Sequence, residues 1–140
     1  MPIWKRPVDL DALNQDNRNT LMEALGIRVT AVEHDALYGT LPVDERTRQP
    51  FGFLHGGASV ALAETLGSIA ANLAAEPGHV AMGLEINANH VKAVRSGLVT
   101  GCARPLQIGR SVQVWDVRLE TDQRELVCAA RLTVAVRETR

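Results

Sequence analysis

The segment that decides the fold reads Gln49-Pro-Phe-Gly-Phe-Leu-His55-Gly56-Gly57-Ala-Ser-Val-Ala-Leu-Ala-Glu64-Thr-Leu-Gly-Ser68. A helix that begins at Gly56 or Gly57 can continue to about Ala75, because the first stop after it is Glu76-Pro77-Gly78. With a turn of about 100° per residue, its larger apolar residues share one narrow stripe, and these are Leu62, Leu66, Ile69 and Leu73. The segment therefore predicts one long helix whose apolar stripe packs on a sheet.

The opposite side of this helix carries small residues around a single carboxylate. It holds Gly57, Ala61, Glu64, Ser68 and Ala71, and no other side chain between His55 and Glu76 is charged. An ionised carboxylate among apolar groups is costly unless its pKa rises or polar partners hold it. A solvent-exposed Glu is the alternative, but solvated helix faces usually carry Lys and Arg. Glu64 is therefore a candidate catalytic group, with room beside it for a ligand or a partner subunit.

The rest of the chain predicts short helical pieces and six strands. Residues 10–25 are typical of a helix in two pieces, with a capping box at Thr20-Leu-Met-Glu23 and a stop at Gly26. Alternating apolar residues predict a hairpin over 27–43 and four more strands over 80–90, 98–106, 111–119 and 126–136. Within 111–119 the alternation changes phase after Val114, which predicts a β-bulge.

These elements define the expected architecture. One helix covers only one face of a strongly curved antiparallel sheet. The predicted fold class is α+β, with the sheet wrapped around one long central helix. The 140 residues, 46% of them hydrophobic, suffice for one domain over residues 1–140 and leave no room for a second.

Composition excludes several classes of function. A formal net charge of -1 argues against broad attraction to nucleic acid or anionic membranes. The first residues lack an apolar signal core and no run reaches transmembrane length, so a cytoplasmic location is expected. Cys102 and Cys128 stand alone and are interpreted as reduced, buried residues. Metal, dinucleotide and P-loop signatures are missing, so we expect no metal and no cofactor.

The start of the long helix offers a second chemical feature. The backbone N–H groups of Gly56 and Gly57 lie at the positive end of the helix dipole, where they can bind a developing oxyanion. Gly56 also lets a carbonyl oxygen approach without a Cβ in the way. His55 and Gln49 can orient the loop, donate a hydrogen bond or, in the case of Gln49, position a water. The alternative is a purely structural turn into the helix.

A lipase-like interpretation competes with this one. His55-Gly56-Gly57 is similar to the oxyanion segment of lipases, and Gly57-Ala-Ser59-Val-Ala61 half-matches the nucleophile elbow. However, the elbow lacks its second Gly and a preceding strand. A Ser59 nucleophile is therefore disfavoured.

Three cationic or titratable residues lie at predicted strand ends and turns, namely His90, Lys92 and Arg110. They can hold phosphates, although scattered surface charge is more often only solvated. Gly83, inside a strand, marks either a close approach of another group or a bulge.

Together these residues resemble the hot-dog-fold acyl-CoA thioesterases of the aryl/hydroxybenzoyl-CoA type. Gln49 through Ser68 carries the resemblance, in particular His55-Gly56-Gly57 and Ala63-Glu64-Thr65. Further matches to the branch with the enterobactin proofreading and 1,4-dihydroxy-2-naphthoyl-CoA thioesterases are Ile3-Trp4-Lys5-Arg6, Leu41-Pro-Val-Asp44, Gln49-Pro-Phe-Gly, and Pro105-Leu with Gly109-Arg110. The resemblance covers essentially the whole chain.

The resemblance implies a homotetramer of two hot-dog dimers, with each active site shared across a dimer interface. It assigns Glu64 the role of nucleophile or general base, and the Gly56 amide the polarisation of the thioester carbonyl. Gln49, His55 and Ser68 would orient the acyl group or the water. Positions that contact the CoA arm and its phosphates would be Gly83, His90, Val91, Lys92, Arg110 and Ser111.

One departure bears on the substrate. Relatives often carry His-Arg-Pro where this chain has Val91-Lys92-Ala93, and Lys lacks the bidentate phosphate geometry of Arg. An acyl carrier protein thioester is therefore an alternative to CoA. The leading hypothesis is hydrolysis of aromatic or hydroxyaryl acyl-CoA thioesters, with CoA entering only as part of the substrate. The rival hypotheses are a hot-dog dehydratase or hydratase and a non-catalytic acyl-CoA binding protein.

Overall fold

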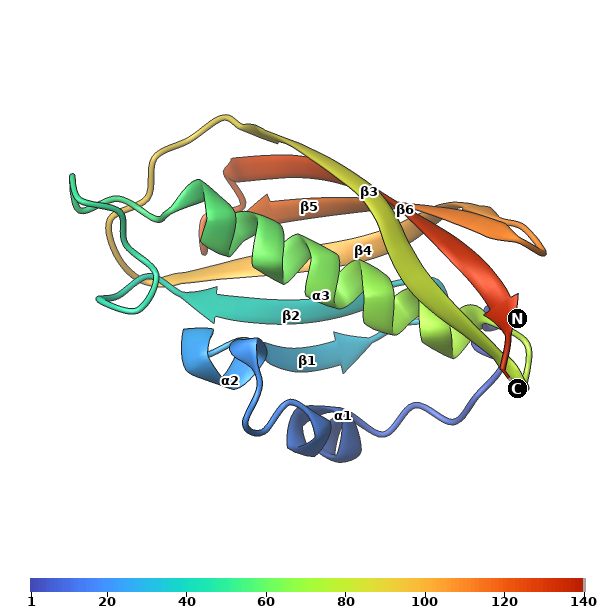
Figure 1. Ribbon diagram of the computed structural model, residues 1–140. Helices are drawn as coiled ribbons and strands as arrows, with labels where there is room; N and C mark the ends of the chain where they lie inside the picture. Colours follow the sequence, from blue (N-terminus) through green and yellow to red (C-terminus); the bar gives the residue numbers. More distant parts are fainter. Residues whose placement is uncertain (140) are drawn as a thin grey trace.

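The computed structural model describes residues 1–139, and its elements follow the predicted order (Figure 1). The helices and strands are α1 (Leu10–Asp16), α2 (Leu21–Leu25), β1 (Arg28–Val32), β2 (Leu37–Pro42), α3 (Gly56–Ala74), β3 (His79–His90), β4 (Leu98–Ile108), β5 (Val112–Glu120) and β6 (Leu126–Glu138). The prediction of one long helix between a hairpin and four strands is confirmed. Among these residues no helix combines the length and the hydropathy that a membrane span requires.

The six strands form one antiparallel sheet in the order β1-β2-β4-β5-β6-β3. Figure 1 shows α3 lying along one face of this twisted sheet. Strands β1 and β3 are the two edges, so β3, which follows α3 in the chain, lies at the far side of the sheet from the hairpin.

The apolar stripe of α3 packs on the sheet as predicted. Leu62 and Leu66 are fully buried. The strands make room for Leu66, because a Cβ at either Gly39 or Gly101 would lie 2.7 Å from its methyl carbons. Burying a leucine side chain stabilises a fold by roughly 1.5–3 kcal/mol. This stripe therefore fixes which face of α3 meets β2 and β4 and leaves Glu64 beside the edge strand β3.

The N-terminal residues close the far end of α3. The indole of Trp4 stacks on Trp115 with ring centroids 6.3 Å apart, and the Lys5 amide donates to the carbonyl of Leu73 over 2.8 Å. The motif Ile3-Trp4-Lys5-Arg6 thus serves to hold the end of the helix.

The predicted capping box before α2 does not form. Thr20 occupies the N-cap position, but its side chain makes no capping hydrogen bond, since its hydroxyl donates to the carbonyl of Asn17. The stop is as predicted, because Gly26 adopts a left-handed conformation with φ of 78°.

The predicted bulge in β5 is also wrong. The pairing of β5 with β6 is unbroken from Val112 to Leu119, and the irregularity lies in β4, between Pro105 and Gln107. The inner face of β5 includes Gln113, which is 1% exposed. Because Gln113 is polar, the apolar alternation of the inner face is interrupted at this position, and the sequence suggested a change of phase instead.

Candidate active site

A loop ties Gln49 and His55 to the start of α3. The Gln49 side-chain oxygen accepts hydrogen bonds from the Phe51 amide, over 2.6 Å, and from the Phe53 amide, over 3.3 Å. Gly52 turns the chain between them with φ of 90°. The role of Gln49 visible within the chain is therefore to hold this turn in shape.

The N-terminus of α3 leaves one glycine amide free. His55 is the N-cap residue, and its Nδ1 accepts a hydrogen bond from the Gly57 amide over 2.8 Å. Because Nδ1 is an acceptor, a neutral ring carries its proton on Nε2. Within residues 1–139 the Gly56 amide makes no hydrogen bond. Of the two glycines, Gly56 thus presents an unpaired donor at the positive end of a 19-residue helix.

His90, at the end of β3, lies against this amide. A Cβ at Gly56 would be 3.0 Å from Nε2 of His90. The fold thus brings His90 and Gly56 together although 33 residues of chain lie between them. The glycine gives the imidazole close access to the helix start.

Glu64 is exposed and faces Gly83 of β3. A Cβ at Gly83 would lie 2.6 Å from Oε2 of Glu64, so only glycine leaves room for this carboxylate position. Ser68 follows one turn later on α3 and is half-buried. Glu64 is eight residues beyond Gly56, which is about 12 Å along a helix axis. Within one chain, the free amide and the carboxylate are too far apart to act on the same carbonyl group.

The residues expected to hold CoA fall into two groups. His90 and Lys92 line a hollow of about 310 Å³ at the N-terminal end of α3. Val91 between them is exposed. Arg110 and Ser111 line a different hollow, of about 900 Å³, beside Ala74 and Ala75 at the other end of that helix. A helix of 19 residues is about 28 Å long, so one chain does not bring all these residues together.

Lys92 already has a partner within the chain. Its Nζ lies 3.2 Å from Oε2 of Glu125, and both side chains are partly exposed. Exposed pairs of this kind are weak, at about 0–1 kcal/mol. A ligand phosphate can therefore compete for Lys92.

Comparison with known proteins decides the family. Residues 51–128, more than half of the chain, match the thioesterase superfamily. The chain belongs to this superfamily.

The chain is similar to known thioesterases over nearly its whole length. It is 47% identical over 134 residues to the 1,4-dihydroxy-2-naphthoyl-CoA hydrolase of Escherichia coli, covering 96% of this chain and 98% of that one. It is 49% identical to the proofreading thioesterase EntH of Cronobacter turicensis, with the same coverage. A thioesterase structure from Haemophilus influenzae superposes with a TM-score of 0.95 at 48% identity, covering 97% of this chain and 95% of that one. The hot-dog fold is confirmed, and the chain is a thioester hydrolase.

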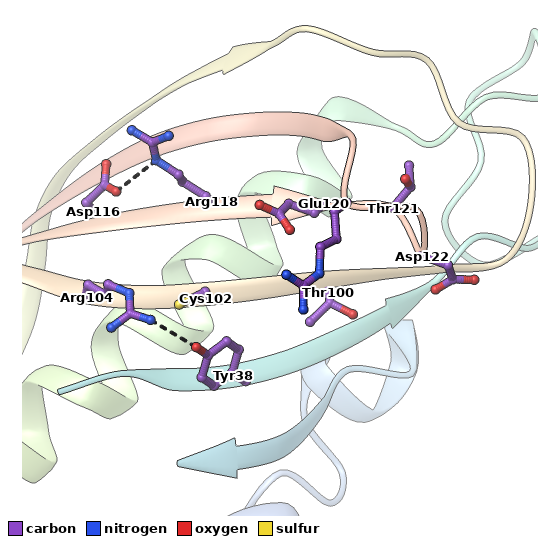
Figure 2. A pocket seen from close by; sticks show the side chains of 10 residues that line it. Tyr38, Thr100, Cys102, Arg104, Asp116, Arg118, Glu120, Thr121 and Asp122 are labelled. Carbon is purple, nitrogen blue, oxygen red and sulfur yellow. Dashed lines mark hydrogen bonds and ion pairs between the residues drawn. The ribbon is translucent and has the colours of Figure 1, made fainter. Parts of the chain in front are cut away.

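Sequence reasoning did not find a polar hollow on the outer face of this thioesterase. It has a volume of about 670 Å³ and is lined by side chains of β2, β4 and β5 that alternate with the core residues (Figure 2). Arg104 reaches the hydroxyl of Tyr38 over 3.0 Å, and Arg118 pairs with Asp116 over 3.2 Å. A hydrogen bond to Glu33 raises the pKa of Tyr38, and burial raises the pKa of the Cys102 thiol. Arg104 and Arg118 thus have acidic partners, and no residue that lines this hollow belongs to the predicted site.

Proposed function

We propose that this thioesterase hydrolyses aromatic acyl-CoA thioesters, including hydroxyaryl ones, to the free acid and CoA. The observation that carries the proposal is that α3 presents a free Gly56 amide at its start and an exposed carboxylate, Glu64, about two turns later. A relative named for hydrolysis of 1,4-dihydroxy-2-naphthoyl-CoA supports an aromatic acyl group.

The chemistry follows from these two groups. The Gly56 N–H donates a hydrogen bond to the thioester carbonyl oxygen and stabilises the negative charge that develops there. Glu64 either attacks the carbonyl carbon, which gives a mixed anhydride and CoA thiolate, or takes a proton from an attacking water. His55, Gln49 and Ser68 orient the acyl group or the water. Single-turnover hydrolysis in heavy-oxygen water separates the two routes, because only the anhydride route places label in Glu64.

A complete site requires two subunits. The axial distance of about 12 Å between Gly56 and Glu64 supports a site in which these residues come from different chains. Strand β3 has a free edge with exposed Met82 and Leu84, which offers a contact surface for a second copy. We propose a dimer built at this edge and a homotetramer made of two such dimers.

The same arrangement explains the two groups of CoA-binding residues. One subunit supplies His90, Val91 and Lys92 beside its Gly56, and its partner supplies Gly83 beside its Glu64, together with Arg110 and Ser111. Lys92 provides one positive charge for a phosphate. This also suits an acyl carrier protein, whose phosphopantetheine arm carries a single phosphate. CoA remains the first choice because Arg110 adds a second cation.

The test is free-thiol release from benzoyl, hydroxybenzoyl, naphthoyl and aliphatic CoA thioesters by wild type and Glu64→Gln. We expect faster hydrolysis of the aryl thioesters, and a loss of about a hundredfold or more in the variant, as for removal of a general base. Glu23→Gln, which changes an exposed carboxylate on α2 outside both hollows, is the control and should retain activity. Equal rates for wild type and Glu64→Gln would contradict the role of Glu64, and a preference for aliphatic thioesters would contradict the substrate class.

A further inference from the structure

The small hollow at the N-terminal end of α3 is lined by apolar side chains together with the polar residues Gln49, Ser59, His90 and Lys92. Its volume is about 310 Å³, and Phe53, Leu54 and Val127 contribute the apolar part. The guanidinium carbon of Arg95 lies 4.1 Å from the centroid of the Phe53 ring, which holds the ring in place. A pocket of this size suits a single aromatic ring.

Among the polar residues of this lining, Ser59 is the one that is almost completely buried. Its side chain lines the hollow, and the residue is only 2% exposed. The Ser59 hydroxyl makes no hydrogen bond within residues 1–139, although serines inside helices commonly bond back to a carbonyl one turn earlier. Among those residues, the only fully enclosed side-chain polar atom without a partner is Nδ2 of Asn17. The small remaining exposure of Ser59 therefore includes its hydroxyl, which opens into the hollow.

The position of Ser59 relates it to the reacting carbonyl. It follows Gly56 by three residues, which places it on the same side of α3 and about 4.5 Å further along the axis. An acyl group whose carbonyl oxygen meets the Gly56 amide can extend into the hollow toward Ser59.

Nucleophilic catalysis is not the use of this hydroxyl. A serine nucleophile needs a base within hydrogen-bonding distance. His55 is the nearest imidazole in sequence, and its Nδ1 accepts a hydrogen bond from the Gly57 amide instead. His90 lines the same hollow but makes no hydrogen bond to Ser59.

We propose that Ser59 is a specificity-determining residue whose hydroxyl exchanges a hydrogen bond with a ring hydroxyl of the acyl group. This inference rests on the proposed aryl thioesterase function. An unsubstituted ring would cover the Ser59 hydroxyl and leave it without water or partner, whereas a hydroxylated ring supplies the partner. Sites built to bind a substrate hydroxyl discriminate strongly against analogues that lack it.

The experiment compares kcat/KM for benzoyl-CoA and for the 2-, 3- and 4-hydroxybenzoyl-CoA thioesters in wild type, Ser59→Ala and the control Ser96→Ala. We expect wild type and the control to favour at least one hydroxybenzoyl isomer over benzoyl by about tenfold or more. In Ser59→Ala this ratio should fall to within about threefold of unity, with benzoyl hydrolysis retained. Alanine is a good helix former, so the variant should fold.

The outcomes separate this inference from the function on which it rests. Hydrolysis of no aryl thioester by wild type would overturn both. Aryl hydrolysis with an unchanged hydroxyl preference in Ser59→Ala, or with no preference in wild type, would overturn the role of Ser59 alone. An equal loss for all four substrates would also overturn it, because the hydroxyl would then serve the part of the substrate that they share. Thermal unfolding gives a second readout: a lower Tm of Ser59→Ala would indicate a structural hydrogen bond and contradict the proposal.

Discussion

At the scale of single residues, the site depends on one backbone donor that only a proline substitution removes. Gly56 is the first residue of α3, and the preceding His55 has an extended backbone with ψ of 132°. Proline is well tolerated at the first helical position, and it accepts an extended residue before it. Proline at position 56 therefore deletes the N–H while keeping the helix.

We predict that Gly56→Pro lowers kcat for aryl thioesters by about a hundredfold to a thousandfold, the usual loss of one oxyanion-hole donor. Gly56→Ala is the matched control, since it adds the same Cβ, 3.0 Å from His90, but keeps the N–H. Steady-state thiol release with both variants checks this. Equal losses in the two variants would assign the effect to crowding of His90 and not to the missing donor.

At the scale of elements, the buried polar pair in β5 fixes the register of the central strand. Gln113 accepts a hydrogen bond from the Trp115 indole over 2.8 Å and donates to the Ala71 carbonyl of α3 over 3.3 Å. Both side chains are almost fully buried. The pair therefore links the sheet to the helix that carries Glu64.

We predict that Gln113→Leu lowers the free energy of unfolding by about 1–3 kcal/mol, because the buried indole N–H loses its acceptor. Val112→Leu is the control, since Val112 points to the outer face and is 39% exposed. Urea unfolding of the three proteins measures the difference. Equal stability of Gln113→Leu and wild type would contradict the inner position of Gln113.

The helix α3 was predictable from the sequence, whereas the register of β5 was not. The period of Leu62 and Leu66 and the stop at Glu76-Pro77-Gly78 were enough to define α3. The register of β5 was not predictable, because a polar residue at an inner position carries no local sign of its partners.

The candidate site combines features that are local in the sequence with contacts between distant segments. The segment 49–68 pointed to Glu64 and Gly56 through local spacing alone. The contacts of His90 with Gly56 and of Gly83 with Glu64 join α3 to a different strand, and only the folded chain shows them.

At the scale of the whole molecule, neutral groups that are buried or half-buried set the response of stability to high pH. Burial raises the pKa of the Cys102 and Cys128 thiols, and the hydrogen bond to Glu33 raises the pKa of Tyr38. A group whose pKa is higher in the folded state stabilises the fold below its unfolded pKa. That contribution is lost as the pH rises toward the folded pKa.

We predict that the free energy of unfolding declines above about pH 8.5, the ordinary pKa of a thiol. Urea unfolding under reducing conditions, repeated from neutral to alkaline pH, measures this. Cys128→Ala should show a shallower decline than wild type. The same slope in both proteins would contradict the contribution of Cys128.

The proposed assembly requires that Gly56 and Glu64 of different subunits act on one carbonyl. Co-expressing Gly56→Pro with Glu64→Gln, each expected to lose about a hundredfold or more of the activity alone, tests this by free-thiol release from a hydroxybenzoyl-CoA thioester. If the subunits of a two-fold symmetric dimer assort at random, half the dimers are mixed and one of their two sites is intact, so activity should return to about a quarter of wild type. No recovery in purified mixed dimers would contradict the account and place both residues of each site in the same chain.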